Sequence, residues 1–114
     1  MGQESDIKLE NRGSVIIFNI TGDVTTASDS AFKQAYESAG KSDHILLMFN
    51  PGCYINSGGI AVLIQLLGQA RQSNQKIGLT GLSDHFKKIF RMVGVTKFAR
   101  IYDSVDEALG GMNA

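Results

Sequence analysis

The sequence predicts an α/β protein with a single-layer mixed, mostly parallel β-sheet of about five strands, packed with about four helices. Short apolar runs alternate with helix-patterned segments along the 114 residues, which is typical of a sheet joined by crossover helices. The run Ile45 to Phe49 (ILLMF) has no polar residue, which predicts a central strand covered on both faces. The length fits one domain over residues 1–114.

The first two expected strands form a hairpin. Val15 to Ile20 (VIIFNI) reads as a buried strand, and Ile7 with Leu9 indicates a shorter, half-exposed strand before it. The polar break at residues 11–13 lies between them and would turn the chain back. The hairpin therefore adds an antiparallel edge to the sheet.

Four helices are expected, each with a polar start and an apolar face. The first is Ala27 to Gly40, with Ser28 or Asp29 as its cap, and the second is Ile60 to Gln72. Ser83 and Ser104 would cap the third and fourth helices. The expected inward residues of the second helix are Ile60, Leu63, Ile64 and Leu67, and those of the third are Phe86, Ile89, Phe90 and Val93.

Two further strands complete the predicted sheet. Ile77 to Leu82 (IGLTGL) lies between the second and third helices, and Phe98 to Tyr102 (FARIY) reads as a short edge strand. The expected order is therefore β-β-α-β-α-β-α-β-α. Crossovers of this kind make neighbouring strands parallel.

Composition narrows the classes of function. Eleven basic residues balance eleven acidic ones, so we expect no general attraction to nucleic acid. No apolar run approaches the roughly 20 residues that span a bilayer, so direct membrane insertion is not expected. The polar start does not resemble a signal peptide, and the single cysteine, Cys53, suits a reducing cytoplasm.

No catalytic or metal-binding group can be named from the sequence. There is no CxxC or Cys/His cluster, and neither His44 nor His85 belongs to a nucleophile–base arrangement. We therefore expect a protein that is not an enzyme and that needs no cofactor and no metal. The sequence does not set an oligomeric state.

Two loops at the carboxyl ends of strands are the candidate site. They are residues 22–26 (GDVTT) and 50–59 (NPGCYINSGG), and open α/β sheets place their sites at such loops. Ser57 lies at or next to the start of a helix, where free N–H groups favour an anion. A simpler reading stays open: Asn56-Ser57 only caps the helix, and Gly58-Gly59 only allows close packing.

The order of these motifs resembles the STAS domain family, which includes bacterial anti-sigma-factor antagonists and the cytoplasmic tails of sulfate transporters. The resemblance covers nearly the whole chain. Its central match is Ile55 to Ile60 (INSGGI), which is similar to the family's aliphatic-Asp-Ser-Ser/Thr-Gly-Leu signature. The other matching segments are Gly22-Asp23-Val24, ILLMF, the third-helix run Phe86 to Val95, and the C-terminal run Phe98 to Leu109.

The resemblance implies a regulatory interaction module rather than an enzyme. In the antagonist branch, an anti-sigma factor that is itself a serine kinase phosphorylates the first Ser of the signature, which corresponds to Ser57. The implied partner is an anti-sigma factor of this kind, bound by the unphosphorylated form. The implied partner-binding residues are Asp23, Thr25, Asn56, Ser57, Gly58 and Gly59.

Two other functions stay open at this stage. Asn56 stands where the signature has Asp, Gly58 replaces its second Ser/Thr, and Thr25 stands where many antagonists carry an acid. These neutral residues favour a STAS scaffold, without phosphorylation, in a signalling or transport complex. The anion-friendly helix start favours, more weakly, a small-ligand or nucleotide-binding STAS domain.

Overall fold

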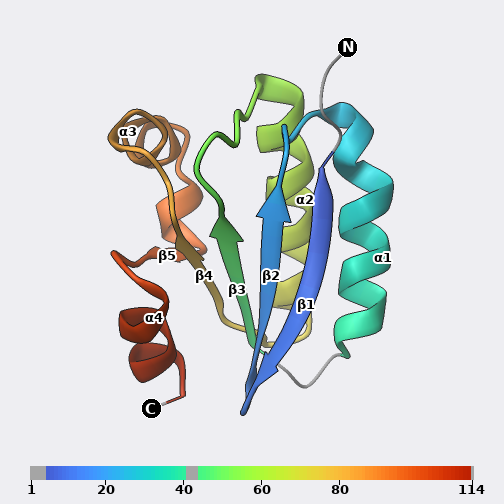
Figure 1. Ribbon diagram of the computed structural model, residues 1–114, viewed down its shortest axis with the longest axis vertical. Coiled ribbons are helices and arrows are strands. Elements are labelled where there is room, and N and C mark those ends of the chain that lie inside the picture. Colours follow the sequence, from blue (N-terminus) through green and yellow to red (C-terminus); the bar gives the residue numbers. More distant parts are fainter. Residues whose placement is uncertain (1–4, 41–43, 114) are drawn as a thin grey trace.

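A five-stranded sheet forms the centre of the molecule, in the computed structural model that describes residues 5–40 and 44–113 (Figure 1). The strands lie side by side in chain order: β1 (Asp6–Arg12), β2 (Val15–Thr21), β3 (His44–Phe49), β4 (Ile77–Thr80) and β5 (Arg100–Ile101). β1 pairs with β2 antiparallel, and every later pair is parallel. The predicted sheet, with its antiparallel edge, is confirmed.

The helices cover the sheet unequally. They are α1 (Asp29–Ala39), α2 (Ser57–Gln72), α3 (Asp84–Met92) and α4 (Val105–Met112), with 3₁₀ turns η1 (Thr26–Ser28) and η2 (Val95–Lys97). Side chains from α1, α2 and α3 join the larger core on one face. Those of α4 join a smaller core on the other face (Figure 1).

The alternation of side chains along β2 serves both cores. Phe18 and Ile20 point into the larger core, whereas Val15 and Ile17 point toward α4. β3 does the same, with Leu46 in the smaller core and Leu47 in the larger one. The prediction of a central strand covered on both faces is therefore confirmed.

Two helices begin differently from the prediction. Ser28 occupies the N-cap position of α1, as one of the two expected caps, but its side chain makes no cap bond to the helix. Asp29, the other expected cap, is the first residue of α1, and Thr25 caps the η1 turn that precedes it. α2 begins at Ser57 rather than at Ile60, because Asn56 supplies the cap. The helix therefore includes both glycines of its first turn.

Two apolar residues lie more outside than predicted, and the last strand is shorter than predicted. Ile64 is 46% exposed and Val93 is 50% exposed, since Val93 only follows the end of α3. Phe98 is also 50% exposed, because η2 precedes it and β5 shortens to Arg100–Ile101. Along residues 5–40 and 44–113, no helix is both long enough and apolar enough to cross a bilayer.

Candidate functional site

The two loops singled out in the sequence lie side by side at the carboxyl edge of the sheet. β2 and β3 are parallel neighbours, so their loops leave the same edge. Val24 and Ile55 form a parallel bridge, in which the Val24 N–H donates to the Tyr54 carbonyl at 2.8 Å. The Asn56 N–H donates to the Val24 carbonyl at 3.2 Å. The sheet is thus extended by one short bridge beyond β2 and β3.

Asn56 fixes the start of α2. Its backbone is extended, and its side-chain oxygen accepts a hydrogen bond from the Gly59 N–H at 2.8 Å. The Asn56 carbonyl accepts from the Ile60 N–H at 2.9 Å. Asn caps a helix about as well as Asp does, so the exchange in the signature keeps this geometry and removes only the charge.

Ser57 is the first residue of α2, and its side chain is exposed. The first turn of α2 contains no acidic residue. A helix start carries the positive end of the helix dipole and free N–H groups, so a negative charge is favoured there. The Ser57 side chain therefore lies in contact with solvent, at a place that tolerates an added anion.

Gly58 and Gly59 let the two loops touch. A Cβ on Gly59, which is buried, would overlap the Val24 carbonyl. A Cβ on Gly58 would overlap the Thr26 hydroxyl. The close packing considered for these glycines thus exists, but it is helix against loop rather than helix against sheet.

Asp23 and Thr25 are both half-exposed on the neighbouring loop. The Thr25 hydroxyl accepts from the Ala27 N–H at 3.1 Å, and the Thr25 N–H donates to the Ser28 hydroxyl at 3.0 Å. Thr25 therefore holds the turn in place as part of a capping box. Within residues 22–26 and 54–59, two side chains are ionisable: the Asp23 carboxyl group and the Tyr54 phenol.

Polar side chains beneath the loop tie it to the end of β2. The Asn50 side-chain amide donates to the Ile20 carbonyl at 2.8 Å and also contacts the Asn19 side-chain oxygen. The Cys53 thiol donates to the Ile20 carbonyl at 3.3 Å. Burial raises the pKa of the Cys53 thiol, a backbone hydrogen bond with Asn50 lowers it, and the charge of Asp23 raises it. Cys53 is thus held as a neutral thiol.

One exposed aromatic residue of the site escaped the sequence reasoning. Tyr54 is 59% exposed, and its ring lies edge-on to Phe86 of α3 at 6.0 Å between centroids. His85 packs against the same Phe86 ring at 5.2 Å. Tyr54 lies in a loop, where no repeating apolar pattern predicts which residues it contacts. The contact with Phe86 in the folded protein shows that α3 borders the site.

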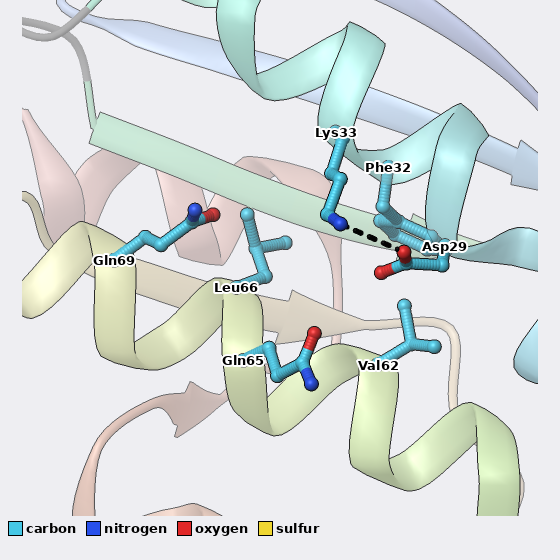
Figure 2. A pocket seen from close by; sticks show the side chains of 7 residues that line it. All are labelled: Asp29, Phe32, Lys33, Val62, Gln65, Leu66 and Gln69. Carbon is cyan, nitrogen blue, oxygen red and sulfur yellow. Dashed lines mark ion pairs between the residues drawn. The ribbon is translucent and has the colours of Figure 1, made fainter.

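The structure offers little room for a small ligand between α1 and α2. The cavity there measures about 20 Å³ and lies beneath the Lys33–Asp29 ion pair, whose charged atoms are 3.0 Å apart (Figure 2). Ligand pockets usually measure about 300–1,000 Å³. Within the part of the chain that the structure describes, no group of three His, Cys, Asp or Glu side chains could hold a metal ion.

A comparison with models of protein families identifies the family of this chain. The family model for the STAS domain matches residues 6–108, which includes every strand and the site. The chain belongs to the STAS domain family. The resemblance expected from the sequence is therefore confirmed over nearly its whole length.

Three solved structures share the fold of this chain. A candidate anti-sigma factor antagonist from Thermotoga maritima matches with a TM-score of 0.79 at 15% identity, covering 95% of each chain. An anti-sigma factor antagonist from Mycobacterium paratuberculosis matches with 0.78 at 12% identity, covering 97% of this chain and 96% of its own. The phosphorylated form of SpoIIAA, a Bacillus cell fate determinant, matches with 0.61 at 13% identity, covering 93% and 98%. At such identities the likeness establishes the STAS fold.

Proposed function

We propose that this protein is an anti-sigma-factor antagonist that binds an anti-sigma factor of the serine-kinase type and is switched by phosphorylation at Ser57. The observation that carries the proposal is the exposed Ser57 hydroxyl at the first position of α2, beside the loop 22–26. Structural neighbours that are anti-sigma factor antagonists support the class of partner.

The switch follows from charge at the centre of an interface. A phosphoryl group on Ser57 adds a charge of about −1.5 to −2 at neutral pH. The helix start stabilises this charge in the free protein, whereas a partner packed over the loops would have to desolvate it. Unmodified Ser57 adds no such cost, so the unphosphorylated form is the one that binds.

The proposed partner-binding surface combines side chains with different roles. Its exposed or half-exposed polar groups come from four residues: Asp23, Thr25, Asn56 and Ser57. Gly59 is buried, so its role in the proposal is to bring the two loops together, and half-buried Gly58 shares that role. The antagonist does no chemistry itself: the kinase supplies the nucleotide, the metal ion and the base.

The test is phosphorylation by candidate kinase-type anti-sigma factors of the same organism, with Mg²⁺ and ATP. Intact mass followed by peptide mapping should place one phosphoryl group on Ser57, and Ser57→Ala should remain unmodified. Ser30→Ala is the matched control, because Ser30 is also an exposed serine in a first helical turn and its loss should change nothing. A phosphoryl group on another residue, or on none with every candidate kinase, would contradict the proposal.

The neutral residues of the site favour one alternative, a constitutive scaffold. The side chains of Asn56 and Thr25 both accept cap hydrogen bonds, and neither carries a charge. Asp23 is therefore the one acidic residue in loops 22–26 and 50–59 that a kinase with a preference for acidic surfaces could recognise. A Ser57→Glu variant separates the two functions. A scaffold whose partner binds elsewhere keeps its affinity, whereas the switched antagonist loses it.

A further inference from the structure

β1 is an edge strand with one free side. Among the strands of residues 5–40 and 44–113 it pairs with β2 alone, and it ends the five-stranded sheet (Figure 1). Six of its seven residues are exposed, and Leu9 is an apolar residue at 39% exposure. The outer edge of such a strand presents unpaired N–H and C=O groups, which template pairing with another strand.

The charges of β1 alternate in a way that suits pairing with itself. Asp6, Lys8, Glu10 and Arg12 occupy every second position, so they share one face of the sheet. In an antiparallel pair of two copies centred on Leu9, Asp6 faces Arg12, and Lys8 faces Glu10. By symmetry each pair occurs twice, and every charged residue of the strand meets an opposite charge.

The neighbouring registers are disfavoured by the same charges. A pair centred on Lys8 would place Lys8 against Lys8 and Asp6 against Glu10. A pair centred on Glu10 would place Glu10 against Glu10 and Lys8 against Arg12. Like charges directly opposite each other destabilise a strand pair, so of the registers centred on Lys8, Leu9 and Glu10 only the one centred on Leu9 is complementary, and it is the one that pairs all seven residues.

The opposite face of β1 can accommodate the same register. Leu9 lies on the side of α1, where it borders an open groove of about 270 Å³ that Ala31, Gln34 and Ser38 also line. In the register above, the two Leu9 side chains meet at the two-fold axis, in this groove. The pairing would therefore bury an apolar side chain that the single chain leaves partly exposed.

From this complementarity we propose that two copies of the protein pair through β1, antiparallel and centred on Leu9, and form one continuous sheet. The partner is a second copy rather than another protein because both sides of the charge pattern come from the same seven residues. This surface lies on the outer edge of the sheet, away from α2, and the proposal is independent of phosphorylation at Ser57.

Charge exchange tests the proposal, with sedimentation equilibrium over a concentration series. Wild type should form a dimer, and Lys8→Glu or Glu10→Lys should each weaken it by about tenfold or more, since two pairs become repulsive. The double exchange should restore it. An equimolar mixture of the two single variants should form a heterodimer, because both contacts between positions 8 and 10 are then attractive. Lys88→Glu, at an exposed position of α3, is the control and should leave dimerisation unchanged.

A cysteine variant tests the register directly. Residues directly opposite each other in an antiparallel pair have Cα atoms about 4.5–5.5 Å apart, within the range of a disulfide. Leu9→Cys should therefore cross-link two copies on mild oxidation, and Asn11→Cys, which faces Ile7, should not. Circular dichroism of each variant checks the fold. A wild type that stays monomeric at all concentrations, or single charge variants that dimerise as tightly as wild type, would overturn the proposal.

Discussion

The carbonyl of Val24 lies directly over Gly59, so close that any side chain at the third position of α2 would force the backbone to shift. Val24 belongs to the loop after β2, and Gly59 follows the loop after β3. Their contact, together with the Val24–Ile55 bridge, holds the two halves of the candidate site against each other. The glycines that weaken a helix start by propensity are thus required by packing.

This contact predicts that Gly59→Ala destabilises the protein. The added methyl group meets backbone rather than a flexible side chain, so we expect a loss of about 1–3 kcal/mol in the free energy of unfolding, from overpacking. Gly68→Ala is the matched control in the same helix, because nothing lies within 4 Å of its Cβ position and the site is exposed. It should stabilise by up to about 1 kcal/mol. Urea unfolding of both variants measures the difference, and equal effects would contradict the packing account.

The cap at Asn56 makes a second prediction. Asn56→Ala removes the acceptor of the Gly59 N–H and should lower the free energy of unfolding by about 0.5–2 kcal/mol. Asn56→Asp keeps the acceptor and adds a charge at the favourable end of α2, so it should be as stable as wild type or slightly more stable. Thermal unfolding at neutral pH and low salt checks both variants. A destabilised Asn56→Asp would show that the amide group, rather than its oxygen, is needed.

The sequence predicted the sheet well because its signals are local. The apolar run of β3 and the helix faces of α1 and α4 depend on residues close together in the chain. The bridge between Val24 and Ile55 joins residues about 30 positions apart, and no periodicity reports it. The same limit explains Val93, whose apolar spacing continued the α3 pattern although the helix ends one residue earlier.

The site was predicted in part for the same reason. Asn56 and Ser57 precede an apolar helix pattern, which marks a helix start from sequence alone. The parallel pairing of β2 and β3 brings the loop after β2 over the start of α2. Thr26 then lies over Gly58, and Val24 lies over Gly59. Tyr54 and its contact with Phe86 were missed because α3 returns to the site from a distant part of the chain.

Cys53 should react slowly with thiol reagents. Its pKa is raised mainly by burial and further by Asp23, so at neutral pH the thiolate fraction is smaller than in a free cysteine. Because the folded form holds the proton more tightly, this group's contribution to stability is complete below the ordinary thiol pKa and is lost as the pH rises through the folded value. Asp23→Asn should lower the pKa and quicken the reaction. The rate of reaction with an aromatic disulfide reagent, measured against pH for wild type and Asp23→Asn, gives the thiol pKa and the reactivity of each. Identical profiles for the two proteins would exclude Asp23 as a cause of the raised pKa.

Ser57→Glu should separate binding from stability. A carboxylate at the first position of α2 should raise the free energy of unfolding by about 0.3–1 kcal/mol at low salt. The same charge should weaken binding of the kinase-type anti-sigma factor. Ser57→Gln is the neutral control of equal size, and it should lack the gain in stability. If Gln and Glu weakened binding equally, bulk rather than charge would be the cause.

The central claim is that a phosphoryl group at Ser57 controls binding of the partner. The most direct measurement is isothermal titration of the kinase-type anti-sigma factor with this protein, either unmodified or phosphorylated stoichiometrically at Ser57. We expect the phosphorylated form to bind at least about tenfold more weakly, because a dianion in the interface adds about 1.4 kcal/mol or more of unfavourable free energy. Equal affinity of the two forms for the partner would contradict the account.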